Sequence, residues 1–308
     1  MLLPPRLQAG DLIGVVSPSS PLTAEFQSQY DAGITCLHKM GFRTLAGDFV
    51  GASTWGYCAD PQDKAADINR MFANPQVKAI ICTQGGITAN GCLPHLNWEI
   101  IRANPKVFIG ISDITTLLNA IWQRTGLITF HGNDVMWGFG NNPQPYDLSE
   151  FLAVLAEGRV GAVPANGERH TIRSGVAQGR LIGGNIHCLL KLSGTPYFPD
   201  CQDAILFLEA FRPSPDNLDM CFQQLLQMGI FEQIRGVIIG FIDGLQNNPQ
   251  TTIQMEDILL RITPQFNFPI LKMDDFGHNC PNTTLPVGIR VQMDADDQTL
   301  EFLEPAVL

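Results

Sequence analysis

The chain has 308 residues, 45% of them hydrophobic and 16% charged, and a formal net charge of −11. This length predicts one large domain or two moderate ones, and the low charge density favours well-filled cores over disorder. With 30 Asp plus Glu against 19 Lys plus Arg and no basic cluster, we expect no nucleic acid and no anionic membrane surface as a partner.

The N-terminal half alternates strand-like and helix-like segments. Apolar runs that end in turns cover residues 12–20, 77–86, 106–113 and 127–132, and helix patterns cover 22–40, 59–76, 98–103 and 115–124. Asp60 is a suitable cap for the second of these helices, and Pro61 occupies its first helical position. Strands that alternate with helices at this spacing predict a mostly parallel, layered α/β sheet.

The character of the sequence changes between residues 140 and 180, where the chain becomes polar and rich in turn residues. We therefore divide it into an N-terminal α/β domain at 1–145, a linker at 146–175 and a C-terminal domain at 176–308. The C-terminal part again shows strand and helix patterns, and its end is typical of β-structure. The predicted fold class is α/β, with a layered parallel sheet in the first domain and a smaller, β-rich α/β second domain.

The sequence gives no sign of export, of a membrane span or of a metal site. Two prolines and a Gly-Asp pair stand near the start, where a signal peptide would need an apolar stretch, and no run approaches the ~18 apolar residues of a membrane span. None of the eight cysteines forms a CxxC pair, and neither they nor the six histidines have metal-ligand spacing. We expect a cytoplasmic protein with reduced thiols, no metal and no cofactor.

Unusual residues stand in the loops that follow the predicted strands, where functional loops of α/β sheets gather. The loops are SPSS at 17–20, QGGITANG at 84–91 and SDIT at 112–115. Gly85 and Gly86 would let backbone N–H groups approach a ligand closely, although a plain tight turn explains them equally well. Ser112 either caps the helix that follows it or is a nucleophile held on a tight strand-to-helix turn.

A nucleophilic serine needs a nearby base and a group that orients this base. His278 lies in a loop between two apolar segments, and His131 ends a strand from which it could line the same cleft. Glu209 stands near the end of the apolar run AILFLEAF, where a carboxylate must be paired because burying it alone is costly. The residues alone leave open whether Ser112, Glu209 and His278 form a triad or have separate structural roles. Ile114 stands where a GxSxG elbow has its second glycine.

Taken together, several segments resemble the serine peptidases of the LD-carboxypeptidase and microcin C immunity protein family. The likeness covers nearly the whole chain. In order, the segments are LQAGDLIGVVSPSSP, TQGGITANGCLPHLNW, NPKVFIGISDITTLLNAIWQRTGLITFHG, GRLIGGNIHCLLKLSGTP, ILFLEAF and FPILKMDDFGHNCPNTTLPVG.

The resemblance implies a role for each of these side chains. Ser112 matches the nucleophile of the family, His278 the general base and Glu209 the acid that orients the histidine. The N–H of Asp113 and one N–H from the turn at 85–86 would form the oxyanion hole. The resemblance also implies that the smaller C-terminal domain supplies the acid and the base, and that the protein is a homodimer.

The family contains two activities, and this sequence departs from the pattern of each. LD-carboxypeptidases remove a terminal D-alanine from cell-wall tetrapeptides, and many carry Arg-Gly-Gly-Tyr-Gly where this chain has Gln84 to Thr88. The microcin immunity branch cleaves an amide in peptidyl- or aminoacyl-nucleotide toxins, and a loop tryptophan stacks on the nucleobase. The corresponding stretch at 163–175 has no aromatic residue. We expect a carboxypeptidase acting on small peptides, with a hydrolase of peptidyl-nucleotides as the alternative and a non-catalytic peptide binder as a further one. Trp137 is the aromatic residue that we expect first in the cleft.

Overall fold

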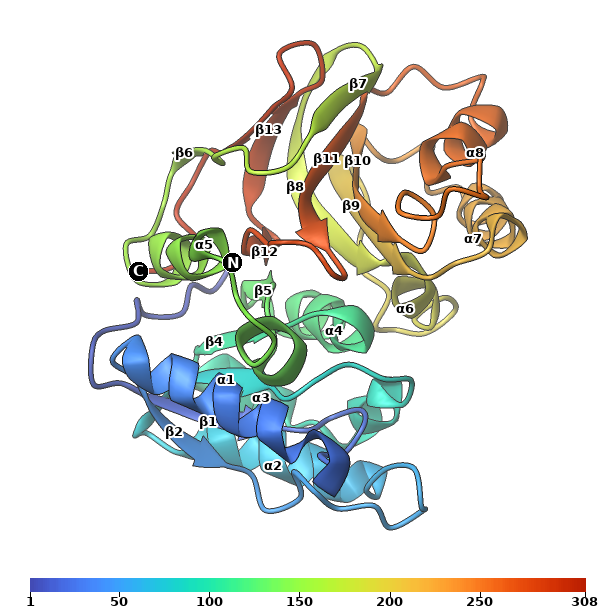
Figure 1. Ribbon diagram of the computed structural model, residues 1–308. Helices are drawn as coiled ribbons and strands as arrows, with labels where there is room; N and C mark the ends of the chain where they lie inside the picture. The colour runs from blue at the N-terminus through green and yellow to red at the C-terminus, as the bar shows by residue number, and fades with distance from the viewer.

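The computed structural model describes all 308 residues and contains two β-sheets, each formed mainly by one half of the chain (Figure 1). The elements of the first half are β1 (Leu12–Val16), η1 (Ala24–Phe26), α1 (Gln27–Lys39), β2 (Arg43–Ala46), α2 (Pro61–Ala73), β3 (Val77–Cys82), η2 (Ala89–His95), α3 (Trp98–Ala103), β4 (Val107–Gly110), η3 (Ser112–Ile114), α4 (Thr115–Thr125), β5 (Thr129–His131), η4 (Val135–Phe139) and α5 (Pro145–Leu155). Those of the second half are β6 (Gly161–Ala162), β7 (Arg169–Arg173), β8 (Val176–Asn185), α6 (Ile186–Leu190), β9 (Ala204–Phe211), α7 (Pro215–Gln227), β10 (Gly236–Asp243), α8 (Met255–Ile262), β11 (Ile270–Gly277), β12 (Leu285–Val287), β13 (Arg290–Asp294) and β14 (Thr299–Phe302).

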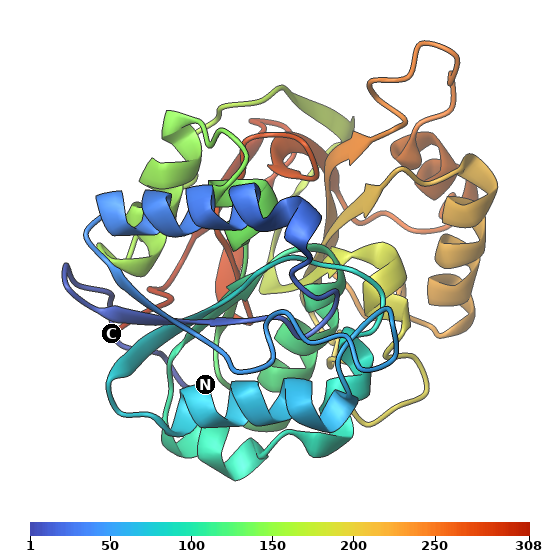
Figure 2. The ribbon, with the colours of Figure 1, turned by 60° about the horizontal axis from the view of Figure 1, so that its bottom comes forward.

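The N-terminal sheet has the strand order β12-β5-β4-β3-β1-β2, and all its strands are parallel except β12. The prediction of a mostly parallel, layered sheet is therefore confirmed. The chain moves from β1 outward to β2 and then returns to β3 on the other side of β1. Helices α1 and α2 consequently cover opposite faces of the sheet (Figure 2). The loops after β1 and β3 diverge at this reversal, which is where α/β sheets bind their ligands.

The C-terminal sheet has the order β6-β14-β13-β8-β9-β10-β11-β7. Strands β8 to β11 are parallel in its centre, and the others pair antiparallel at its edges. The last thirty residues contain β12, β13 and β14, as the β-rich pattern at the end of the sequence predicts. Of these, β13 and β14 belong to this sheet, and β12 joins the N-terminal sheet. This sheet has eight strands against six in the N-terminal sheet.

Residues 146–175, the predicted linker, carry most of α5 and the edge strands β6 and β7. Strand β7 pairs only with β11, and its side chains are exposed or half-buried. An edge strand of this kind needs no alternation of apolar residues, so the sequence pattern is that of a loop. The exact division of the chain into domains stays a prediction.

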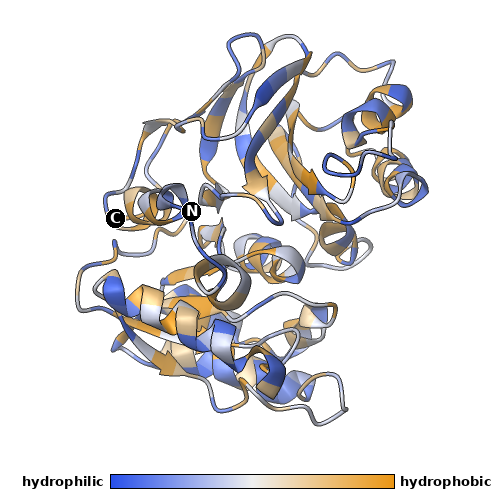
Figure 3. Cartoon of the chain, in the orientation of Figure 1, coloured by the Kyte–Doolittle hydropathy of each residue, from blue (hydrophilic) through white to orange (hydrophobic).

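A continuous hydrophobic core connects the two halves of the molecule. Figure 3 shows apolar residues concentrated on the strands of the N-terminal sheet, with polar residues along the outer sides of its helices. Between the sheets, the His131 ring of β5 packs edge-on against Phe207 of β9 and Phe276 of β11. These contacts hold β5, β9 and β11 against one another. None of the helices has the length and apolar content that a bilayer crossing requires.

Candidate active site

Ser112 lies at the carboxyl end of β4 with a φ of 64°, in the left-handed region that residues other than glycine rarely adopt. Such strain persists only where the surroundings impose it, and it concentrates at functional sites. Gly110 permits the turn, because a Cβ there would lie 2.9 Å from Cγ2 of Ile114. The tight turn thus uses a glycine two residues before the serine. Neither η3 nor α4 has a side-chain cap, so the structure gives no support to a capping role for Ser112.

The Gly85-Gly86 turn after β3 lies directly against the serine turn. A Cβ added at Gly85 would lie 2.6 Å from Cβ of Ser112, 2.8 Å from its Oγ and 3.4 Å from the backbone nitrogen of Asp113. Gly86 has a φ of 144°, which a residue with a side chain rarely adopts. A plain tight turn, the alternative that the sequence leaves open, does not account for this close approach of the Gly85 backbone to Ser112.

His278 and Glu209 form a short hydrogen bond in the second half of the chain. His278 follows β11, and its Nδ1 lies 2.5 Å from Oε2 of Glu209, which is fully buried on β9. Burial acts to raise the pKa of Glu209, but the charge and hydrogen bond of His278 hold it below its ordinary value. Burial likewise acts to lower the pKa of His278, and the Glu209 carboxylate raises it above its ordinary value. This pairing leaves Nε2 of the imidazole free to act as a base.

A cavity of about 790 Å³ brings residues from the two halves together. Ser112, Gly85, Gly86 and His278 all line it, whereas the side chains of Glu209 and Asp113 are fully buried behind its wall. No hydrogen bond joins Ser112 and His278. Catalytic hydrogen bonds are often long in enzymes without substrate and shorten when substrate binds.

The carboxylate of Asp113 forms a buried network that the sequence does not reveal. It accepts hydrogen bonds from Oγ of Ser19 at 2.5 Å, the backbone nitrogen of Ala89 at 2.8 Å and Nζ of Lys191 at 2.5 Å. Lys191 follows α6 in the second half and also donates to the carbonyl of Ile87 at 2.8 Å. Asp113 therefore connects the loops that follow β1 and β3 to the C-terminal half of the chain. No spacing in the sequence connects Lys191 with this site.

A second carboxylate, that of Asp147 on α5, holds the loop that follows His278. It accepts hydrogen bonds at 2.7 Å from the side chain of Asn133 and the backbone nitrogen of Asn282. Asn282 in turn binds the backbone of Gly277, directly before the histidine, at 2.8 Å. This polar network lies in the wall of the cavity and fixes the course of the chain around the imidazole. No pattern in the sequence indicates this network.

Trp137 lines the cavity, as expected from the sequence, and is 42% exposed. Its Nε1 donates to the side-chain oxygen of Gln84 at 3.1 Å. Asp134 caps the same short helix, and burial raises its pKa to about 6. His131, in contrast, does not line the cavity: it is fully buried, and neither ring nitrogen has a hydrogen-bond partner. The expectation that His131 lines the cleft is therefore wrong, because β12 and the phenylalanines of β9 and β11 cover it.

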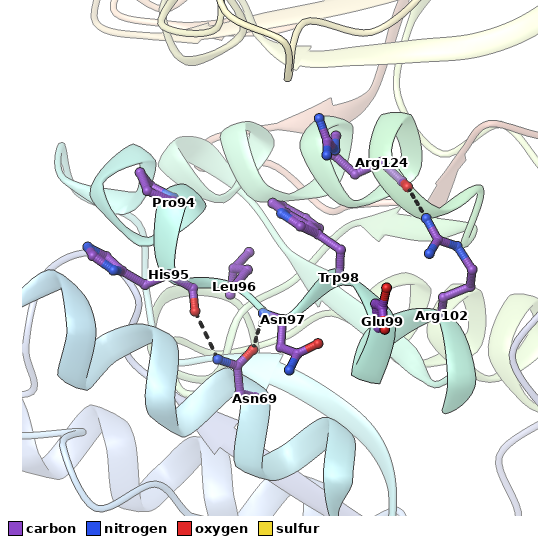
Figure 4. Close-up of a pocket in the computed structure, with 9 residues that line it drawn as sticks. All are labelled: Asn69, Pro94, His95, Leu96, Asn97, Trp98, Glu99, Arg102 and Arg124. Atoms are coloured by element: carbon purple, nitrogen blue, oxygen red, sulfur yellow. Dashed lines mark hydrogen bonds between the residues drawn. The ribbon is translucent and has the colours of Figure 1, made fainter.

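A separate hollow of about 550 Å³ lies beside α2, α3 and α4 (Figure 4). Its lining residues are Asn69, Pro94, His95, Leu96, Asn97, Trp98, Glu99, Arg102 and Arg124. The hydrogen bonds drawn there involve backbone atoms: the Asn69 side chain holds the segment before α3, and Arg102 binds the carbonyl of Arg124. These contacts stabilise helix ends and provide no acid–base pair. Nowhere in the molecule do three or more His, Cys, Asp or Glu side chains form a group that could hold a metal ion.

Comparisons with known proteins agree over nearly the whole chain. Residues 13–132 match the LD-carboxypeptidase N-terminal domain and residues 178–293 the LD-carboxypeptidase C-terminal domain of peptidase family S66. The chain is 30% identical to a putative carboxypeptidase of Vibrio cholerae over 98% of both chains. It is 28% identical to a probable murein peptide carboxypeptidase of Bacillus subtilis, over 96% of this chain and 92% of the relative.

The fold comparison gives the same result. The structure superposes on that of the microcin C7 self-immunity protein MccF of Escherichia coli with a TM-score of 0.94 and 27% identity, over 100% of both chains. The two-domain α/β architecture is thus that of a known enzyme family. The chain belongs to the LD-carboxypeptidase family of serine peptidases, peptidase family S66.

Proposed function

We propose that the protein is a serine LD-carboxypeptidase that releases the terminal D-alanine of murein tetrapeptides, with Ser112 as nucleophile, His278 as base and Glu209 as the acid that orients it. The observation that carries the proposal is the position of the hydrogen-bonded His278–Glu209 pair beside a cavity that Ser112 also lines. A strained serine, an imidazole and a buried carboxylate contributed by separate strands are the parts that acyl transfer requires.

In the proposed mechanism, Nε2 of His278 takes the proton of Ser112 as Oγ attacks the carbonyl carbon of the scissile amide. Glu209 holds the imidazole in the tautomer with its proton on Nδ1 and stabilises the positive charge that forms. The imidazolium then gives its proton to the leaving amine, and the acyl group stays on Ser112. Water, deprotonated by the same histidine, releases the acyl group and restores the hydroxyl.

The oxyanion of each tetrahedral intermediate needs hydrogen-bond donors that are already in place. We assign this role to the N–H of Asp113 and one N–H of the Gly85-Gly86 turn, because Gly85 lies against both Ser112 and the Asp113 nitrogen. Loss of one such donor lowers kcat by roughly 10²- to 10³-fold in serine peptidases. The carboxylate network of Asp113 keeps its peptide unit and the glycine turn together.

The proposed substrate fits the dimensions of the site. A cavity of about 790 Å³ lies within the range that encloses small molecules and short peptides. The relative from Bacillus subtilis carries the name probable murein peptide carboxypeptidase. We further propose a cytoplasmic location and a homodimer, and sedimentation at several concentrations tests the latter.

A second candidate function is hydrolysis of the amide in a peptidyl- or aminoacyl-nucleotide toxin. The close superposition on MccF favours it, since other structures of that protein are described with aspartyl sulfamoyl adenosine and glutamyl sulfamoyl guanosine. Trp137 could stack on a base in the cavity. Against it, residues 163–175 contain no aromatic side chain.

The test is incubation of the purified protein with a murein tetrapeptide, measuring released D-alanine, beside a parallel reaction with an aminoacyl-sulfamoyl adenosine. We expect D-alanine release by the natural sequence and by Ser28→Ala, whose serine is exposed on α1. Ser112→Ala should abolish it. Hydrolysis that survives in Ser112→Ala would refute the nucleophile assignment, and cleavage of the nucleotide substrate alone would favour the second candidate. Binding of the peptide with no turnover of either substrate would identify a non-catalytic binder.

A further inference from the structure

Arg212 is the only lysine or arginine among the residues that line the cavity. It follows β9 directly, three residues after Glu209, and its side chain is 68% exposed. The other charged groups there are His278 and the carboxylates of Asp134 and Asp147, and both carboxylates accept hydrogen bonds from the protein. Arg212 forms an ion pair with Asp243 through Nε, and its guanidinium is the one Lys or Arg head group that faces an anionic ligand in this cavity.

The conformation of Arg212 keeps one edge of the guanidinium free. Its Nε donates to Oδ2 of Asp243 at 3.1 Å, and its backbone nitrogen donates to the carbonyl of the same residue at 2.8 Å. The terminal nitrogens Nη1 and Nη2 make no hydrogen bond within the protein. Arg212 has a φ of 45°, and Gly244 packs so closely that a Cβ there would lie 2.8 Å from Cα of Arg212. The backbone is thus held in an unfavourable conformation by its surroundings, and the Nε bond to Asp243 anchors the side chain.

The position of Arg212 relative to the base indicates which part of a substrate it meets. Its guanidinium carbon lies 5.1 Å from the centre of the Phe211 ring, and that ring lies 4.8 Å from the centre of the His278 imidazole. In the proposed mechanism the imidazolium gives its proton to the leaving amine, so the leaving group lies on the histidine side of the scissile bond. The oxyanion donors lie on the other side, at the glycine turn.

We propose that Arg212 binds the free carboxylate of the C-terminal residue that the enzyme releases, and so restricts cleavage to the last peptide bond. This inference rests on the proposed function. A guanidinium offers parallel N–H donors that match the two oxygens of a carboxylate, whereas a longer chain or a terminal amide has no negative charge at that point. Arg212 is a specificity-determining residue in this scheme and takes no part in proton transfer.

The test compares a murein tetrapeptide that has a free C-terminal carboxylate with the same peptide ending in a carboxamide. The natural sequence should prefer the acid by roughly 2- to 5-fold in kcat/KM, because solvent weakens an ion pair whose guanidinium is largely exposed. In Arg212→Gln, kcat/KM should fall for the acid and stay unchanged for the carboxamide, chiefly because KM for the acid rises, so the preference is lost. Arg212→Lys should keep part of the preference. Arg235→Gln is the matched control, because Arg235 forms an exposed ion pair with Asp203 outside this cavity.

The two proposals fail in different ways. Equal cleavage of acid and amide by the natural sequence, or an equal loss on both substrates in Arg212→Gln, overturns the role of Arg212 and leaves the hydrolase proposal intact. If neither peptide is cleaved, the proposed function fails, and calorimetry with Ser112→Ala decides on Arg212. In that measurement tighter binding of the acid supports the inference, and equal or absent binding of the two peptides overturns it.

Discussion

Gly85→Ala tests whether catalysis depends on the close approach of the glycine turn to the serine. The new Cβ would lie 2.6 Å from Cβ of Ser112 and 2.8 Å from its Oγ. Non-bonded carbon atoms prefer about 3.5–4.0 Å, so the turn or the serine must move by about 1 Å. Gly85 does not occupy the left-handed region, so alanine adds no backbone strain of its own and the effect comes from this contact.

The expected result is a large loss of activity with a moderate loss of stability. A displacement of about 1 Å near the reacting atoms costs on the order of 10² in rate, and overpacking of this kind costs about 1–3 kcal/mol of folding free energy. The assay is kcat/KM for D-alanine release from the tetrapeptide. Urea unfolding, followed by circular dichroism, confirms that the variant is folded under the assay conditions.

Gly91→Ala is the matched control in the same segment. A Cβ there would meet the nearest atom, Cγ of Pro61, at 3.4 Å, which is an ordinary contact. We expect this variant to keep the activity of the natural sequence. A folded Gly85→Ala enzyme as active as Gly91→Ala would refute the argument, because it would mean that neither the serine nor the proposed oxyanion donor depends on the geometry of the turn.

Three further predictions follow from buried charged or polar groups. Glu209→Gln removes the charge that raises the pKa of His278, so kcat should fall by on the order of 10³–10⁴. The acidic limb of the kcat/KM profile should then move to lower pH, because burial lowers the pKa of the imidazole and the main charge that opposes this effect is gone. Lys191→Met leaves the Asp113 carboxylate buried without its ion pair and should lower the free energy of unfolding in urea by roughly 3 kcal/mol. Burial lowers the pKa of His131 to about 4, so protonation near pH 6.5 in the unfolded chain destabilises the fold as the pH falls from about 6.5 to about 4. His131→Phe should remove this part of the pH dependence in urea titrations at pH 7 and pH 5, and an unchanged slope would contradict it.

Local chemistry explains why much of the N-terminal domain could be predicted from the sequence. Helix α2 begins at Pro61, and the Asp60 side chain accepts a hydrogen bond from the backbone nitrogen of Gln62, as the capping pattern indicates. Strands β1, β3 and β4 are apolar runs that end in Gly, Ser or polar turns, and each lies where the pattern places it. These signals depend on neighbours in the chain, so a single sequence is sufficient to find them.

Features that depend on distant partners could not be predicted in this way. Strand β12 is short and pairs antiparallel with β5, although most of its neighbours in sequence belong to the other sheet. The left-handed conformation of Ser112 depends on its surroundings, and its only local sign is Gly110. The pairing of Glu209 with His278 could be predicted only from the family resemblance, because 69 positions separate the two residues and no local pattern identifies the partner of either.

The buried network around Asp113 has a consequence for catalysis beyond stability. The proposed nucleophile comes from the N-terminal half, and the proposed base and acid come from the C-terminal half, so the rate depends on how the halves are held together. Lys191 crosses between them and binds both the Asp113 carboxylate and the carbonyl of Ile87 in the glycine turn. Without this cation, the peptide unit that follows Ser112 and the turn that faces it lose their common anchor. Lys191→Met should therefore lower kcat by a larger factor than it raises KM, even in the absence of urea, where the variant is fully folded.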